Sequence, residues 1–361
     1  MSALKGLRVV EFASIGPGPF CAMMLADHGA DVVSIERPGG EAEGVPAGGH
    51  EQLRRGRLRV VADLKDPQAR AGVAQLVDRA DVLIEGYRPG VMERLGFGPA
   101  DCQSRNPRLV YGRMTGWGQT GPLASRVGHD INYIALSGVM ASIGEAQRPV
   151  PPLNLVGDFG GGGMLLAFGL LAALYARGSS GRGQVIDAAM LDGAVLLNTM
   201  TLSMFNAGAW NPRRESNLLD GGAPFYRAYE TADAKWMAVG ALEPKFFAAL
   251  CEGLGLPADT VDRQYDRESW PRLQEALSAA FRARTRDDWV ARFEGLDACV
   301  TPVLDFTEAA REPQLAARGA LRVHDGRIVV GPAPRMEDTP ARAAATREAS
   351  LEEVLRRWTH G

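Results

Sequence analysis

Cysteine is scarce in this sequence of 361 residues, and its spacing excludes several kinds of site. The four cysteines stand far apart in the chain, at Cys21, Cys102, Cys251 and Cys299. Because no Cys-x-x-Cys pair is present, neither a zinc knuckle nor a dithiol redox motif is expected. Scattered single thiols are typical of proteins of the reducing cytosol. We therefore expect a cytoplasmic protein without a metal site.

An excess of charge is missing as well. The sequence has 40 Lys and Arg residues against 43 Asp and Glu residues, which gives a formal net charge of −3. Proteins that bind nucleic acids usually carry a basic excess, so no nucleic-acid partner is expected. Lysine is rare, at positions 5, 65, 235 and 245, and the other basic residues are arginines. A single arginine is therefore weak evidence of a site in this chain.

Long hydrophobic runs are also absent. The longest apolar run, Met164 to Ala176, is interrupted by Gly169 and is shorter than the roughly 20 residues that a membrane span needs. The first residues lack the charged-then-apolar layout of a signal peptide. The composition, 46% hydrophobic and 23% charged, is typical of globular enzymes. We expect no membrane partner and, at this length, two domains.

The first half of the chain alternates strand and helix patterns. Helices are predicted at 20–29 and 67–79, with short apolar strands at 7–12, 30–35, 58–64, 81–85 and 108–113. Such alternation favours a parallel sheet covered by helices on both faces. From residue 229 a hairpin over 229–240 and helices over 244–293 indicate a smaller α+β domain. The predicted boundaries are 1–195, completed by 326–361, for the large domain, 196–228 for a connecting helix and linker, and 229–325 for the small domain.

The turn after the first strand has part of a dinucleotide-binding pattern. Gly16-x-Gly18 is followed by an acidic residue at about the expected distance. The third glycine of the pattern would fall at Cys21, however, and Pro17 and Pro19 lack the amides that would face a pyrophosphate. We interpret the segment as a tight strand-to-helix turn and expect no nicotinamide cofactor.

Two polar residues lie in unusual surroundings. His129 is one of five histidines and stands between a glycine and an aspartate in the segment 128–133. Asp158 opens the strongest predicted helix, 158–176, and is followed by Phe159 and the run of four glycines 160–163. A lone histidine is more often structural, and Asp158 has an ordinary alternative as a helix N-cap. Glycine costs about 1 kcal/mol per residue in a helix, so the run indicates close approach of a ligand or of another backbone.

These segments resemble those of the alpha-methylacyl-CoA racemases, a branch of the family III CoA-transferase group. The specific elements are His129-Asp-Ile-Asn-Tyr133 and Gly157-Asp-Phe-Gly-Gly161. Further matching segments lie at 6–11, 62–65, 81–88, 116–121, 219–226 and 297–303, so that the resemblance covers nearly the whole chain. The tail at 346–350 departs from the family pattern, and the segment 39–50 has no firm counterpart.

The resemblance implies the family III CoA-transferase fold, with a Rossmann-like large domain, a smaller α+β domain and an interlocked homodimer. It also implies epimerisation of 2-methylacyl-CoA thioesters by 1,1-proton transfer at the alpha carbon, with no cofactor besides the CoA of the substrate. His129 and Asp158 would be the two bases on opposite faces of a planar enolate. Glu243 would pair with the imidazole, and Asn154 would donate a further hydrogen bond.

The family's contacts to CoA and substrate map onto three groups of residues. The first group consists of a cation and a strand end, Arg37, Ala62, Asp63, Leu64 and Lys65. The second is the loop Gly86, Tyr87 and Arg88, and the third surrounds the histidine, at Asp130, Ile131, Asn132 and Tyr133. These residue types suit phosphate binding and adenine stacking. Arg37 has an ordinary alternative as a solvated surface arginine.

Two other functions remain open from the sequence. A CoA-transferase of the same family would use Asp158 as a nucleophile on the thioester and would need no second base. A non-catalytic acyl-CoA-binding protein would keep Arg37 and Lys65 but would have no use for His129, Asp158 and Glu243 together. The complete set of three therefore favours the racemase.

Overall fold

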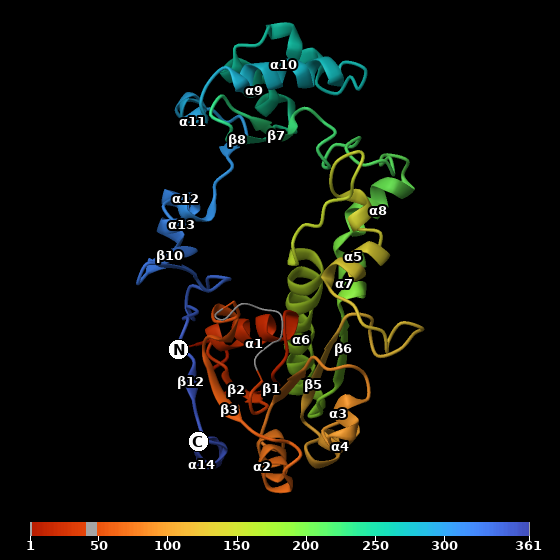
Figure 1. Cartoon of the computed structure of the whole chain (residues 1–361), viewed down its shortest axis with the longest axis vertical. Coiled ribbons are helices and arrows are strands. Elements are labelled where there is room, and N and C mark those ends of the chain that lie inside the picture. Colours follow the sequence, from red (N-terminus) through yellow and green to blue (C-terminus); the bar gives the residue numbers. More distant parts are fainter. Residues whose placement is uncertain (1, 41–48, 361) are drawn as a thin grey trace. The chain divides into compact units, whose positions relative to one another are not determined.

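The chain forms two compact units in the computed structural model, which describes residues 2–40 and 49–360 (Figure 1). Most of the variable segment 39–50 lies outside the described residues. The first unit consists of Met1–Val139, Pro152–Thr199 and Pro313–Gly361. The second unit consists of Met140–Pro151 and Met200–Glu312. Each unit is described by itself below.

A seven-stranded sheet forms the centre of the first unit, and every neighbouring pair of its strands is parallel. This confirms the parallel sheet that the alternating pattern predicts. The order across the sheet is β12 (Arg347–Glu348), β3 (Arg57–Val61), β2 (Asp31–Glu36), β1 (Arg8–Phe12), β4 (Val82–Glu85), β5 (Val110–Thr115) and β6 (Val185–Ala189).

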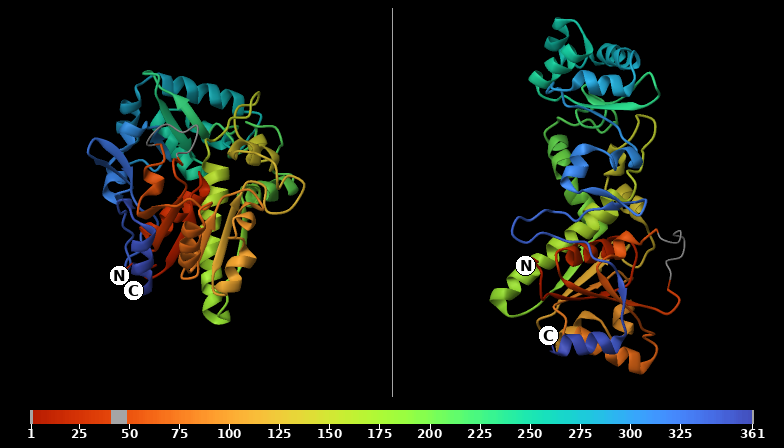
Figure 2. Two further views of the ribbon diagram at one scale, coloured as in Figure 1. Left: turned by 60° about the horizontal axis from the view of Figure 1, so that its bottom comes forward. Right: turned by 90° about the vertical axis from the view of Figure 1, so that its left-hand side faces the viewer.

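Helices cover both faces of this sheet because successive side chains of a strand point to opposite sides. On β1, Val10 belongs to a core that also contains Trp358, whereas Val9 belongs to a core that contains Leu166. The first face is covered by α2 (Pro67–Val77), α3 (Val91–Arg94), α4 (Pro99–Arg105) and α14 (Leu351–His360). The second face is covered by α1 (Pro17–Asp27) and α6 (Leu165–Ser180). Figure 2 shows α6 running beside the strands, and α14 lies against α2.

The strongest predicted helix begins earlier than the sequence indicates. Residues Leu155–Met164 form a π-helical segment, which continues directly as α6. Asp158 therefore lies in the first turn, and Asn154 occupies the N-cap position. Two further helices follow β6, α7 (Met190–Leu197) and α8 (Thr199–Asn206), and α8 lies within the segment 196–228 predicted as a connecting helix and linker.

The continuous helix Leu155–Ser180 is apolar and 26 residues long, so length and composition alone would allow it to cross a membrane. It is longer than the apolar run that the sequence shows. Its buried residues pack in the core of the first unit, with Leu166 and Leu170 fully buried. Other apolar side chains of the helix are not covered, since Phe168 is 70% exposed and Tyr175 89%.

The second unit is built on a three-stranded antiparallel sheet of β7 (Tyr226–Glu230), β8 (Trp236–Gly240) and β9 (Val300–Pro302). The predicted hairpin is confirmed, with its first strand beginning three residues earlier. An aromatic core that includes Phe225, Phe281 and Trp289 joins the sheet to the helices. The helices of this core are α9 (Pro244–Leu254), α10 (Trp270–Arg282) and α11 (Arg286–Phe293). The second unit also contains most of α8 and the short α12 (Phe306–Ala309).

The remaining elements are short. The first unit also contains α5 (Asp130–Leu136), α13 (Pro313–Arg318) and the hairpin β10 (Leu321–His324) and β11 (Arg327–Val330). Single 3-10 turns occur at Gln52–Arg54, Met140–Ser142 and Ala258–Arg263.

Candidate active site

A cleft of about 900 Å³ opens at the carboxyl edge of the parallel sheet, within the first unit. This edge is where α/β proteins bind their ligands, because the loops that follow the strands meet there. The loops after β1, β4 and β5 all contribute to the cleft. Among the residues that line it are Gly16, Gly86, Tyr87, Arg88, Trp117, Arg126, His129, Tyr133, Asn154, Asp158, Phe159 and Met190.

His129 lies at the N-cap of α5, with its imidazole exposed and lining the cleft. Its backbone is extended, at φ −130° and ψ 173°, and its amide donates to Oδ1 of Asn132 at 3.0 Å. Asn132 therefore fixes the start of the helix instead of turning to the cleft. The backbone of His129 is thus held at its amide and at its carbonyl oxygen, which accepts from the Asn132 amide at 2.8 Å, while the residue stays exposed at the cleft.

Asp158 is half-buried and also lines the cleft. Asn154 donates from Nδ2 to Oδ2 of Asp158 at 3.0 Å. Burial raises the pKa of Asp158 above its usual value, the charge of Asp130 raises it further, and the Asn154 hydrogen bond and the charge of His129 lower it. A side chain at Gly16 would lie 3.1 Å from Oδ2, so that the glycine leaves this face of the carboxylate open.

The glycine run 160–163 serves helix packing. A Cβ at Gly193 on α7 would lie 1.9 Å from the carbonyl oxygen of Gly161, and one at Gly163 would lie 2.9 Å from the carbonyl oxygen of Pro17 on α1. None of the four glycines is among the residues that line the cleft. Of the two explanations that the sequence left open, the close approach of another backbone is therefore the one that the structure shows.

Residues of the segment after His129 pack against neighbouring parts of the cleft lining. Tyr133 donates its hydroxyl to the carbonyl oxygen of Gly128, and its ring packs edge-on against Trp117 with the centroids 4.7 Å apart. Burial raises the pKa of Tyr133 to about 12, so this phenol stays neutral. Asp130 is buried with its carboxylate toward the backbone of Asp158, whereas Ile131 is exposed and is not among the lining residues.

The residues expected to bind CoA divide into two groups. Gly86, Tyr87 and Arg88 follow β4 and line the cleft, and the Tyr87 hydroxyl donates to the carbonyl oxygen of Ala13 at 3.2 Å. Burial raises the pKa of Tyr87, and the charge of Arg37 lowers it, which places that guanidinium within electrostatic range.

The second group lies at the same sheet edge but outside the lining of the cleft. Arg37 follows β2 directly, and the amide of Ala62, after β3, donates to the carbonyl oxygen of Glu36 at 2.8 Å. The next residues, Asp63, Leu64 and Lys65, form a turn in which the Lys65 amide donates to Oδ1 of Asp63 at 2.9 Å. Lys65 and Arg37 are both exposed. Their contact with CoA stays a prediction.

Glu243 belongs to the second unit, where it is the exposed N-cap residue of α9. Burial raises the pKa of the Cys299 thiol, and the charges of Glu243 and Asp297 raise it further. The pairing of Glu243 with His129 stays a prediction, because the two residues lie in different units.

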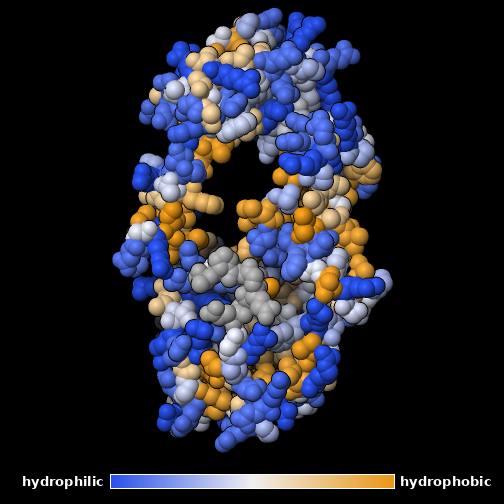
Figure 3. Space-filling model, viewed as in Figure 1, coloured by the Kyte–Doolittle hydropathy of each residue, from blue (hydrophilic) through white to orange (hydrophobic). Residues whose placement is uncertain are grey.

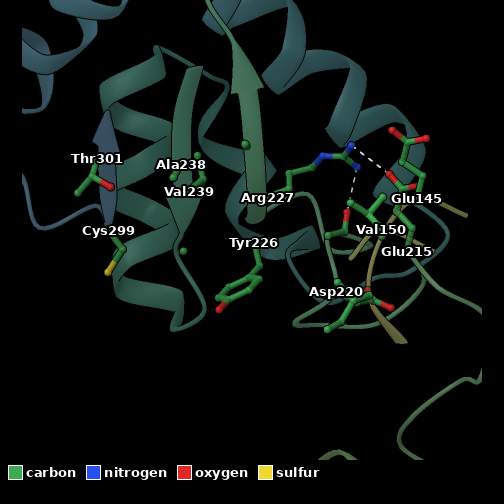
Figure 4. Close-up of a pocket in the computed structure, with 15 residues that line it drawn as sticks. Glu145, Val150, Glu215, Asp220, Tyr226, Arg227, Ala238, Val239, Cys299 and Thr301 are labelled. Carbon is green, nitrogen blue, oxygen red and sulfur yellow. Dashed lines mark hydrogen bonds and ion pairs between the residues drawn. The ribbon is translucent and has the colours of Figure 1, made fainter. Parts of the chain in front are cut away.

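A separate cavity of about 850 Å³ lies within the second unit, beside β7 and β8. Figure 4 shows Arg227 reaching across it toward Glu215, with which it forms an ion pair at 3.2 Å. Nη1 of Arg227 also donates to the carbonyl oxygen of Gly221 at 3.0 Å. The positive charge of Arg227 in this cavity is therefore matched by Glu215.

Several lining residues of the first cleft were not identified from the sequence. Arg126 stands three positions before His129 and is exposed, and Trp117 and Phe159 supply aromatic surface. Arginine is too common in this chain to single out Arg126, and aromatic residues are as common in cores as in sites. Within residues 2–40 and 49–360, no group of three or more His, Cys, Asp or Glu side chains could hold a metal ion.

Comparison with known proteins identifies the family. The model of CoA-transferase family III matches residues 4–349. The α-methylacyl-CoA racemases of Homo sapiens and Mus musculus are 43% and 44% identical to this chain. Each alignment covers 98% of this chain, with 92% of the human protein and 93% of the mouse protein. The resemblance to the racemase branch is confirmed by these matches.

A third relative carries a different description. The probable fatty acyl-CoA transferase Rv3272 of Mycobacterium tuberculosis is 34% identical over 82% of this chain and 82% of its own length. A crystal structure of Rv3272 superposes with a TM-score of 0.79, at 30% identity, over 97% of this chain and 98% of that chain. The expected fold is thereby confirmed.

Proposed function

The chain belongs to CoA-transferase family III, and we propose that within this family it epimerises 2-methylacyl-CoA thioesters. The observation that supports this most directly is the placement of His129 and Asp158 on the lining of one cleft. The imidazole charge of His129 acts on the pKa of the Asp158 carboxyl, which means that the two groups lie within electrostatic range.

Inversion of a carbon atom that carries one hydrogen needs two proton-transfer groups. One base removes the alpha proton to give an enolate, and the conjugate acid on the other face returns a proton with the opposite configuration. A histidine near pH 7 serves as either base or acid. A carboxyl whose pKa is raised by burial keeps its proton to higher pH, so that it can serve as the general acid, and its carboxylate is a stronger base. In the reverse direction the two groups exchange roles.

We propose that Glu243 orients His129, and that the glutamate comes from a second copy of the chain. Large apolar side chains are exposed on each of the two helices α7 and α8, and exposed apolar (orange) residues are visible on the face of the molecule in Figure 3. Leu196 is 57% exposed, Met200 59% and Phe205 50%. A surface of this kind usually marks a contact with another protein. Sedimentation at assay concentration tests this, because a fully active monomer would contradict a shared site.

A CoA-transferase remains the second candidate, since Rv3272 is described as a probable transferase. In that reaction the Asp158 carboxylate would attack the thioester carbonyl and release CoA thiolate, leaving a mixed anhydride. The exposed imidazole of His129 in the same cleft would then have no assigned role. This difference favours the epimerase.

The two functions are separated by one experiment. Each pure epimer of a 2-methylacyl-CoA is incubated with the protein in heavy water, without added cofactor, and C2 is followed by NMR. Epimerisation predicts deuterium uptake at C2 and the same final mixture from either epimer. Transfer of CoA to an added free acid, with C2 unchanged, would establish the transferase and refute the proposal.

A further inference from the structure

Asp130 connects the two segments that carry the candidate bases. It is the first residue of α5 and the direct neighbour of His129 in the chain. Its side chain is buried, at 7% exposure, and Oδ1 accepts the backbone amide of Asp158 at 2.7 Å. The amide of Gly157 also stabilises the ionised carboxyl. One carboxylate thus joins the start of α5 to the first turn of the π-helical segment.

Gly157 provides the space for this carboxylate. A Cβ at Gly157 would lie 2.4 Å from Oδ1 of Asp130, closer than any real side chain tolerates. The backbone of Gly157 is not among the left-handed glycines, so its conformation does not require glycine. The close approach of Asp130 is therefore what excludes a larger residue at this position.

The other carboxylate oxygen, Oδ2 of Asp130, is buried without a hydrogen-bond partner among the described residues. Leaving a buried polar atom unsatisfied costs about 1–3 kcal/mol. An exposed acidic residue in the first turn of α5 would interact with the helix dipole as favourably as a buried one. Helix stability alone thus does not explain a buried carboxylate that reaches across to Asp158.

We infer that Asp130 is a positioning residue, whose carboxylate holds the His129 and Asp158 segments at a fixed separation and does not itself contact the acyl-CoA. This replaces the substrate contact that the sequence implies for Asp130, and it rests on the proposed epimerase function. Two-base proton transfer requires both groups at reacting distance from one carbon atom. A displacement of about 1 Å in such a site costs on the order of 100-fold in rate.

The charge of Asp130 should also affect the pH dependence of the reaction. It raises the pKa of Asp158, whereas the charge of His129 lowers it. The Tyr133 phenol is another titratable group of this segment, and α1 and α7 present only Pro17 and Met190 to the cleft. Among the described residues, the other charged or titratable side chains that line the cleft are His50, Tyr87, Arg88 and Arg126. Removing the Asp130 charge should therefore lower the pKa of Asp158 and move the acidic limb of the pH profile of kcat/KM to lower pH.

The test compares Asp130→Ala and Asp130→Asn with the wild type, using both epimers in heavy water. Asp130→Ala should lower kcat for epimerisation about 100-fold in both directions with little change in KM. Asp130→Asn keeps an acceptor oxygen and should restore most of kcat, with the acidic limb moved to lower pH. A rise in KM alone in Asp130→Ala would show a substrate contact and refute the inference, as would an unchanged kcat.

Gly157→Ala tests the same contact without altering Asp130. Its Cβ would displace the carboxylate, so a folded Gly157→Ala protein should reproduce the kcat loss of Asp130→Ala. Gly178→Ala is the matched control, because that glycine is exposed in α6 with open space around it. Asp66→Ala, which removes the N-cap of α2, controls for the loss of one carboxylate bond to an amide.

The outcomes separate this inference from the proposed function. A wild-type protein that exchanges no deuterium at C2 refutes the epimerase itself. A wild-type protein that epimerises, with Gly157→Ala and Asp130→Asn both showing wild-type rates and pH profiles, refutes only the positioning role. If Asp130→Ala does not fold, those two variants carry the test.

Discussion

Buried carboxylates occur in two regions of the first unit, inside the sheet and beside the cleft. The two regions differ in whether an arginine pairs with the carboxylate. In the sheet, Glu11 on β1 forms an ion pair with Arg57 on β3 at 2.7 Å, and both side chains are almost fully buried. Beside the cleft, Asp130 and Asp158 have no Lys or Arg partner among the described residues. The sheet neutralises its carboxylates, whereas the cleft leaves them able to change protonation state.

The difference indicates that the unpaired carboxylates beside the cleft lower the stability of the fold and serve the chemistry of the site. Burial raises the pKa of Glu85 in the sheet as well, but Arg113 at 2.9 Å favours its ionised form. At Asp158 the neighbouring charge of Asp130 acts in the same direction as burial. Groups with a pKa perturbed in this way, in a cleft, are typical of catalytic sites.

The largest expected effect is on catalysis at the cleft. His129→Ala should abolish epimerisation, and yet Asp158 should still exchange deuterium into the epimer whose C2–H faces it. Asp158→Ala should show the opposite preference. Loss of one general base typically costs about two to four orders of magnitude in rate, so residual exchange should be measurable by NMR.

Two outcomes would change this account. Equal exchange of both epimers by both variants would indicate one base and a reorienting enolate. Complete loss in Asp158→Ala with no loss in His129→Ala would make Asp158 a nucleophile.

Glu243→Gln should slow exchange on the His129 face more than on the Asp158 face.

The next effect is on stability, in the sheet. Arg57→Met leaves Glu11 buried without its partner, and breaking a buried pair in this way costs about 3–5 kcal/mol. The free energy of unfolding, measured in urea, should fall by this amount. Arg59→Met is the control, because Arg59 is 29% exposed and pairs with Glu36 near the edge. If the two variants lost equal stability, the buried Glu11–Arg57 pair would contribute no more to the free energy of unfolding than the partly exposed Glu36–Arg59 pair.

The sequence predicts the sheet well but the cleft only in part. Alternating apolar strands and helices leave few topologies besides a parallel sheet, and the loops of its carboxyl edge contain Gly86–Arg88 and His129. The pairing of Glu11 with Arg57 depends on the register of strands that are not neighbours in the chain. The π-helical start at Leu155 depends on packing against α1 and α7, and so does the burial of the glycine run. No local sequence pattern carries that information.

The smallest expected effect is a gain of stability at Asp158 itself. The pKa of Asp158 is raised in the folded protein, so the folded state binds this proton more tightly than the unfolded state does. The contribution of Asp158 to stability is therefore greatest at acidic pH and is lost as the pH rises through the raised pKa. Asp158→Asn is neutral at every pH and should melt a few degrees higher than the wild type at pH 7 to 8, although it is inactive. The difference in Tm should shrink as the pH is lowered toward 4. A variant that melted lower than the wild type at pH 8 would show that Asp158 supports the fold, as Glu11 does, and the comparison between sheet and cleft would fail.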